Sequence, residues 1–138
     1  MITGDTSRNE AVFPVRIESV WQALTDSDEL TAWLMENDFV ARVGNRFTMR
    51  CDPEGDIECQ VLELDPPRRM VWSWNGEFGE TTVVFELSRV NRGTLLAVEH
   101  RGWSEDGIED AKRFDSGWPS KLAALADHLQ SLQTAAGA

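Results

Sequence analysis

The C-terminal stretch over residues 108–132 constrains the fold more than any other part of the chain. Its apolar side chains recur at steps of three and four residues, which places them in one stripe along a helix. The stripe consists of Ile108, Ala111, Phe114, Trp118, Leu122, Leu125, Leu129 and Leu132. Just before it, Ser104, Glu105 and Asp106 offer a cap and negative charge to the first N–H groups of a helix. The spacing therefore predicts a long helix that needs a wide apolar partner.

Two residues within this stretch disfavour a continuous helix. Gly117 and Pro119 flank Trp118, and a proline removes a backbone donor and crowds the preceding turn. We therefore expect a kink or a short break beside Trp118.

The first residues of the chain predict a flexible lead-in and one short strand. Residues 1–9 are polar and are expected to be weakly ordered. Residues 11–13 favour a strand, which Pro14 ends or confines to the edge of a sheet.

Two short helices are expected next. Apolar residues at helical spacing predict a helix over residues 17–25. The D-x-x-E sequence from Asp26 to Glu29 is typical of a capping box, so a second helix should run to about residue 35. Both are too short to form a core alone, so we expect them to make a corner of a larger structure.

From residue 37 the apolar period changes from helical to alternating, which indicates strands with one apolar face. Short turns rich in Gly, Pro, Asn and Asp separate the strands, which favours an antiparallel meander. A slip in the alternation at residues 62–64 predicts a bulge. The expected strands are 39–42, 46–51, 57–64, 69–74, 82–87 and 96–100.

These elements together predict an α+β fold in which a curved antiparallel sheet packs against the long C-terminal helix, with two short helices after the first strand. At 138 residues the chain is expected to form a single domain over residues 10–134, between flexible termini at 1–9 and 135–138.

The net negative charge of the chain argues against two classes of binding partner. A net charge of -11 argues against nucleic acid and anionic membrane surfaces, which both attract clustered Lys and Arg. No apolar run approaches the roughly 18 residues of a membrane span, and the polar N-terminus lacks the apolar core of a signal peptide. We therefore expect a cytoplasmic protein.

Four short motifs, in their order along the chain, resemble those of the helix-grip superfamily of START and Bet v 1-like (SRPBCC) domains. They are most similar to the branch of that superfamily named for the activator of Hsp90 ATPase. The likeness covers roughly residues 12–132. The motifs are Val20-Trp21-Gln22-Ala23-Leu24-Thr25-Asp26 with Leu30 and Trp33, then Asp65-Pro66-Pro67-Arg68-Arg69, Gly93-Thr94-Leu95-Leu96-Ala97-Val98-Glu99-His100, and Gly117-Trp118-Pro119. The resemblance implies a sheet that grips the long helix and a pocket for an apolar small molecule between them. It implies no particular chemistry, because the architecture hosts lipid carriers, cyclases and co-chaperone domains.

The inward-facing side chains are the candidate ligand cavity, and six Trp with no Tyr make its walls largely indole and phenyl. Large aromatic walls with few polar groups suit an apolar ligand, but the same side chains also suit a solid core. The candidates are Trp33, Phe47, Met49, Cys59, Val61, Trp72, Trp74, Phe85, Leu87, Val98, His100, Trp103, Trp118 and Leu122.

The two histidines receive different interpretations. His100 ends an apolar strand face, where it can anchor a ligand, act as an acid or base near neutral pH, or sit as a satisfied histidine at the core edge. His128 lies beside the apolar stripe of the helix and is expected on the surface.

No cofactor or metal is expected. Cys51 and Cys59 flank a turn on one predicted face, so a disulfide is conceivable if the register pairs them, although cytosolic cysteines are normally reduced. Two cysteines and two distant histidines do not match a zinc pattern. No catalytic motif is present.

Three functions stay open. The first is binding of an apolar or aromatic small molecule, with His100 as the polar anchor. The second is an interaction domain without ligand that resembles the Hsp90 activator and would take a chaperone as partner. The third is a cyclase-like or hydrolase-like enzyme, which would need a buried carboxylate beside His100. An exposed edge strand near residues 11–13 permits either a monomer or a homodimer.

Overall fold

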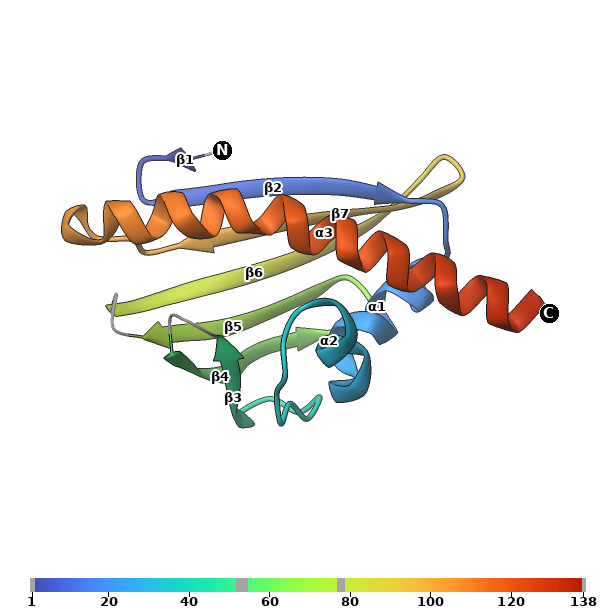
Figure 1. Cartoon of the computed structure of the whole chain (residues 1–138), viewed down its shortest axis with the longest axis horizontal. Coiled ribbons are helices and arrows are strands. Elements are labelled where there is room, and N and C mark those ends of the chain that lie inside the picture. The colour runs from blue at the N-terminus through green and yellow to red at the C-terminus, as the bar shows by residue number, and fades with distance from the viewer. Residues whose placement is uncertain (1, 52–54, 77–78, 138) are drawn as a thin grey trace.

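The backbone forms one seven-stranded antiparallel sheet that lies along a long C-terminal helix (Figure 1). The computed structural model describes residues 2–51, 55–76 and 79–137, and the side chains among them except at positions 51 and 133–137. The strand order is β1-β2-β7-β6-β5-β4-β3. The strands are β1 (Ile2–Thr3), β2 (Thr6–Phe13), β3 (Arg46–Cys51), β4 (Gly55–Asp65), β5 (Arg69–Gly76), β6 (Gly79–Val90) and β7 (Gly93–Arg101).

The helices cover one face and one end of this sheet. The short helices α1 (Ile17–Thr25) and α2 (Ser27–Trp33) form a corner near the C-terminal half of the long helix α3 (Ile108–Gly137) (Figure 1). A single 3₁₀ turn, η1 (Glu105–Gly107), leads into α3, and the Ser104 side chain caps it by accepting from the backbone N–H of Gly107. The predicted helix-grip α+β fold is confirmed.

Several local predictions hold at the level of single residues. Helix α1 has the predicted bounds. Asp26 caps α2, because its Oδ1 accepts from the backbone N–H of Glu29 at 3.0 Å. The register of β4 against β5 shifts between Val61 and Glu63, which is the predicted bulge.

The N-terminal residues expected to be flexible form strands instead. Residues 2–3 pair with Thr6 and Ser7 in a hairpin, and β2 begins at Thr6 and pairs along its whole length with β7. The sequence predicted too short a strand here because the first half of β2 is polar and lacks apolar alternation. Pairing with the central strand β7 stabilises this polar half as a strand. Among the described residues β1 covers only the start of β2, so residues 8–13 form the sheet edge.

Two further expectations are wrong. Residues 39–42 do not form a strand. The preceding residues are held against β3 by a bridge from Asn37 to Met49 and by the hydrogen bond from Thr48 N–H to Asp38 Oδ1. The short break beside Trp118 is absent, because α3 continues through Pro119 and on to Gly137, past the expected flexible C-terminus at residue 135. Leu122, Leu125 and Leu129 pack into the core beyond the proline, so burial of the stripe outweighs the one missing helical hydrogen bond.

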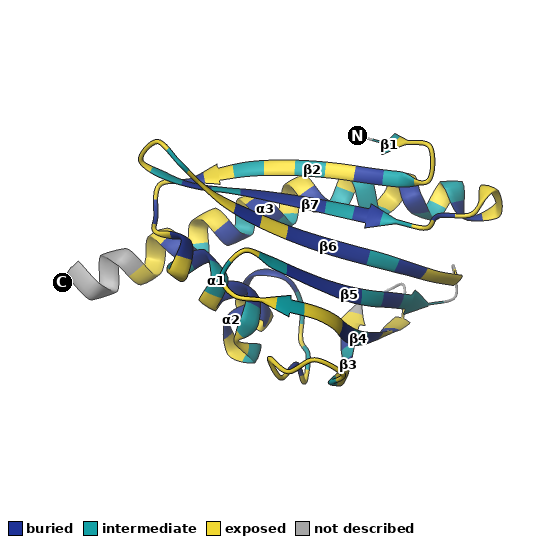
Figure 2. Ribbon diagram, turned by 180° about the vertical axis from the view of Figure 1, so that it is seen from behind, coloured by how far each residue is buried: buried dark blue, intermediate teal, exposed yellow. Residues whose placement is uncertain are grey.

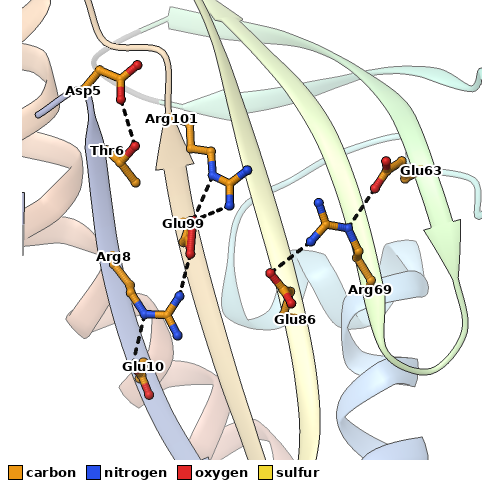
Figure 3. Close-up of polar contacts among 9 residues, drawn as sticks. All are labelled: Asp5, Thr6, Arg8, Glu10, Glu63, Arg69, Glu86, Glu99 and Arg101. Carbon is orange, nitrogen blue, oxygen red and sulfur yellow. Dashed lines mark hydrogen bonds and ion pairs between the residues drawn. The ribbon is translucent and has the colours of Figure 1, made fainter. Parts of the chain in front are cut away.

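The outer sheet face carries ion pairs between neighbouring strands (Figure 3). Glu99 lies between Arg8 and Arg101, with a distance of 2.5 Å from an oxygen to the nearest nitrogen of each. Arg69 lies between Glu63 and Glu86 at 2.8 and 2.9 Å. Arg101 and Arg8 outweigh the effect of partial burial and lower the pKa of the Glu99 carboxyl. Figure 2 shows the burial concentrated in the central strands β5, β6 and β7.

His128 is not the surface residue that its neighbours in the sequence suggest. Its Nε2 lies 2.9 Å from Glu29 Oε1 on α2, and only 15% of its side chain and 11% of the Glu29 side chain are exposed. The pair joins α2 to α3, which are far apart in the sequence and could not be matched from local spacing.

Candidate functional site

All predicted cavity residues lie in the interior between the sheet and the helices, and none has more than 6% of its surface exposed. All of them except His100 and Trp103 belong to one continuous apolar core. Alternation thus assigned the candidates on strands to the inner face, and helical spacing did the same for Trp33, Trp118 and Leu122. Whether they line a ligand site is a separate question, which depends on their polar atoms.

The aromatic rings form two groups. The first, here called the lower cluster, consists of Phe39, Phe47, Trp72 and Phe85, in which neighbouring centroids lie 4.7–5.5 Å apart. The second, here called the His100 cluster, consists of Trp74, His100, Trp103, Phe114 and Trp118. Phe85 and Trp118, with centroids 6.2 Å apart, connect the two.

His100 occupies the middle of the sheet because β7 lies between β2 and β6. Its Cα is opposite Ser7 on one side and Val83 on the other, and its side chain is completely buried. The ring centroid lies 4.5 Å from that of Trp103 and 5.4 Å from that of Phe114. Burial lowers the pKa of His100 to about 3, since the charged imidazolium would lose its hydration among aromatic rings.

One polar contact of His100 is a hydroxyl rather than a carboxylate. Its Nε2 lies 2.8 Å from Oγ1 of Thr81, and that hydroxyl donates to the backbone carbonyl of Trp74 at 2.5 Å. The enzyme alternative requires a carboxylate within reach of the imidazole, and among the described residues no such bond is formed. A histidine that stays neutral near pH 7 is also a poor general acid.

Several buried polar atoms in this region have no hydrogen-bond partner among the described residues. They are Nε1 of Trp72, Trp74 and Trp118 and Nδ1 of His100. Trp33 provides the contrast, because its Nε1 donates to the backbone carbonyl of Ala23 at 2.9 Å. Buried polar atoms are nearly always paired in native proteins, so a local group of unpaired ones needs an explanation.

The core comes close to the surface along the edge strand. A groove of about 260 Å³ separates β2 from α3. Its lining includes Phe13 and Leu122, which also belong to the core, and the exposed Val12. Leu122 is thus a predicted cavity residue that borders an open groove.

The two cysteines lie on the neighbouring strands β3 and β4. The backbone register places Cys59 opposite Phe47 and Cys51 opposite Gly55, so the pairing needed for a disulfide is not the one formed; the Cys51 side chain lies outside the described residues. Cys59 is a free, buried thiol, and burial, with the charges of Glu58 and Asp38, raises its pKa.

The described residues form neither a metal site nor a membrane-spanning helix. No three His, Cys, Asp or Glu side chains gather there as metal ligands. No helix in that part of the chain combines the length and the apolarity needed to cross a membrane.

Three relevant residues were not predicted. Thr81 lies just before the first alternating residue of its strand and was not counted. Phe114 was placed on the helix stripe, yet not among the candidates that contact His100. Phe39 was assigned to a strand, whereas it packs edge-on against Phe47. The helical spacing of Phe114 is the one sequence signal that could have identified it.

Comparison with known structures gives close relatives of the fold. Protein MLL2253 from Mesorhizobium loti has a TM-score of 0.88 at 30% identity, covering 91% of this chain and 97% of the relative. Protein BH1534 from Bacillus halodurans has a TM-score of 0.79 at 28% identity, covering 94% and 99%. The Aha1 dimer from Colwellia psychrerythraea has a TM-score of 0.81 at 23% identity, covering 90% and 95%, which is evidence for the fold alone.

No curated protein matches the chain at a significant level. A protein family, by contrast, matches residues 14–130, which is most of the chain and includes every candidate residue. The family resemblance that the four sequence motifs indicated is therefore confirmed. The chain belongs to the family of Activator of Hsp90 ATPase homolog 1-like proteins.

Proposed function

We propose that this protein binds an apolar or aromatic small molecule among the aromatic rings between the sheet and α3. The observation that carries the proposal is the set of unpaired polar atoms in the His100 cluster. Trp74 Nε1, Trp118 Nε1 and His100 Nδ1 belong to three rings whose centroids lie within 6.4 Å of one another. Each is buried, and none has a partner among the described residues.

The free-energy cost of these unpaired atoms favours a ligand-binding site over a core that binds nothing. A buried donor or acceptor without a partner costs about 1–3 kcal/mol. Three such atoms cost about 3–9 kcal/mol, which is comparable to the roughly 5–15 kcal/mol that holds a typical domain folded. An inert core would gain by replacing these indoles with Phe or Leu, whereas a binding site uses the same atoms to orient its ligand.

The side chains around His100 favour a ligand that is mostly apolar. Aromatic rings contact the imidazole, among them Phe114 on α3 and Trp103 just before η1, and these two rings stack on each other. The polar groups beside it are the hydroxyl of Thr81 and that of Ser7, which lies opposite on β2. A flat aromatic molecule would meet ring faces and edges here and would bury area worth about 25 cal/mol per Å².

The test uses the tryptophans as reporters. Naphthalene, flavone and palmitic acid would be titrated while Trp fluorescence and the melting temperature are followed. The proposal predicts saturable quenching and a melting temperature that rises with ligand concentration for at least one aromatic probe. Trp118→Phe should weaken that response, and Trp21→Phe, which changes a half-buried indole on α1 outside both clusters, should not.

The alternative is the protein-interaction role that family membership suggests. If no probe changes either signal, the binding proposal is contradicted. Binding to purified Hsp90, measured by calorimetry, then becomes the informative experiment.

A further inference from the structure

The hydrogen bonds around His100 determine which of its ring nitrogens carries the proton. The Thr81 hydroxyl has a single proton, which it donates to the carbonyl oxygen of Trp74 at 2.5 Å. Toward the imidazole, 2.8 Å away, Thr81 Oγ1 can therefore only accept. His100 Nε2 must carry the hydrogen, and Nδ1 is left as a bare acceptor.

The ring that carries this acceptor contacts two indoles whose N–H donors are also unpaired. Nδ1 has no partner among the described residues, and the same is true of Nε1 of Trp74 and of Trp118. The Trp74 and Trp118 centroids lie 5.8 and 6.4 Å from that of His100, and 6.3 Å from each other. The site thus offers one acceptor and two donors on rings in mutual contact.

A hydroxyl group is the smallest group that meets both needs, because it donates one hydrogen bond and accepts others. A carbonyl or ether oxygen satisfies the indoles and leaves Nδ1 unpaired. A carboxylate has no hydrogen to donate to Nδ1. Its burial here would also remove its hydration without providing a counterion. Buried polar side chains in the described ranges are Ser7, Glu29, Thr81, Thr94 and His100, with no Lys or Arg among them.

We propose that the His100 cluster recognises an un-ionised hydroxyl on an aromatic ligand, which donates to Nδ1 of His100 and accepts from an indole N–H of Trp74 or Trp118. This inference rests on the proposed function and narrows it to phenol-like ligands. Thr81 acts as a positioning residue, because it fixes the tautomer without touching the ligand. Burial, which holds the imidazole neutral, preserves the acceptor from weakly acidic to alkaline pH.

The experiment compares naphthalene, 2-methoxynaphthalene, 2-naphthol and 2-naphthoate by isothermal titration calorimetry at neutral pH. The four probes share one ring system and differ in hydrogen-bonding groups. We expect 2-naphthol to bind about tenfold more tightly than its methyl ether, which corresponds to one net hydrogen bond, and 2-naphthoate to bind most weakly. In His100→Phe the preference for 2-naphthol over the ether should disappear, while naphthalene still binds.

The outcomes separate the two claims. Equal affinities for 2-naphthol and its ether, or a preference that survives in a folded His100→Phe variant, overturn the hydroxyl inference and leave the binding function standing. No binding by any probe overturns both.

A second measurement needs no variant and guards against a His100 substitution that fails to fold. Imidazole ¹⁵N resonances of the wild-type protein should report hydrogen on Nε2 and none on Nδ1. The Nδ1 resonance should move on addition of 2-naphthol and stay in place with the ether. The opposite tautomer, or equal shifts with both probes, contradicts the inference. Thr81→Val should introduce the Nδ1–H tautomer, because it removes the acceptor that holds hydrogen on Nε2.

Discussion

Glu29 on α2 and His128 on α3 approach to 2.9 Å between Oε1 and Nε2, and both side chains are largely shielded from water. The backbone N–H of Glu29 is meanwhile held by the Asp26 cap. One short helix is thus fixed at its start by a cap and fastened to the long helix by its third residue.

Removing one partner of this pair should destabilise the protein. His128→Ala leaves the Glu29 carboxylate shielded and without that partner, which costs about 1–3 kcal/mol. Urea denaturation measures the loss. Asp127→Ala, at an exposed position of the same turn, is the matched control and should change the free energy of unfolding by less than about 0.5 kcal/mol. A double-mutant cycle with Glu29→Ala should give a coupling of at least about 0.5 kcal/mol, and strictly additive effects contradict the role assigned to the pair.

The paired and unpaired indoles should respond differently to the same truncation. Trp33→Phe removes the donor to the Ala23 carbonyl and leaves that oxygen unpaired, whereas Trp118→Phe removes an N–H that has no described partner. Both changes remove a similar volume from the core. Without added ligand, Trp33→Phe should therefore cost about 1–3 kcal/mol more than Trp118→Phe. Equal losses in chemical denaturation would show that the Trp118 N–H is satisfied in the free protein.

His100 should make the stability depend on pH in a defined window. Its pKa falls from 6.5 in the unfolded chain to about 3 in the fold, so below 6.5 the unfolded chain binds a proton that the folded chain does not. The contribution is complete above pH 6.5 and declines as the pH falls toward 3. Between about pH 7 and about pH 5 the loss should be about 2 kcal/mol.

The control for this prediction is His100→Phe, compared with the wild type over the same pH range. Carboxylates titrate in both proteins, so only the difference between the two curves reports on His100. The variant should lose less stability on acidification than the wild type. Parallel curves would mean that the imidazole is hydrated or paired with a charge.

Two glycines offer an opposed pair of alanine substitutions. A Cβ at Gly93, at the start of β7, would lie 2.2 Å from the backbone oxygen of Phe13, so one backbone must shift. Gly117, inside α3, has no neighbouring atom within 4 Å of the same position. Gly93→Ala should therefore lower the melting temperature by several degrees, and Gly117→Ala should stabilise the protein by about 0.5–1 kcal/mol through helix propensity. Stabilisation by both would contradict the packing of β2 against β7.

The elements that sequence reasoning located correctly are those in which one periodicity runs without interruption. Helix α1 was predicted from the spacing of Ile17, Val20 and Leu24, all of which are buried. The bulge after Val61 was visible because a single residue broke a regular alternation. Alternation along the strands likewise put the cavity candidates that lie on strands on the inner face.

The features that were missed depend on contacts between distant residues. The first half of β2 is polar and is a strand because β7 pairs with it. Glu29 meets His128 across 99 sequence positions. The bond from Thr81 to His100 requires the register of β6 with β7, which places residue 82 opposite residue 101. The sequence contains no local signal for any of these pairings.

In the proposed function, a bound aromatic molecule supplies hydrogen-bond partners to the unpaired atoms of the His100 cluster. The most direct measurement follows the indole N–H resonances of the tryptophans by ¹H–¹⁵N correlation NMR during a titration with 2-naphthol. We expect the Trp74 and Trp118 resonances to shift together and saturate, while the Trp33 resonance, whose N–H already donates to a carbonyl, stays in place. If the Trp74 and Trp118 signals do not move, or if Trp33 moves as much as they do, the aromatic core is not the binding site.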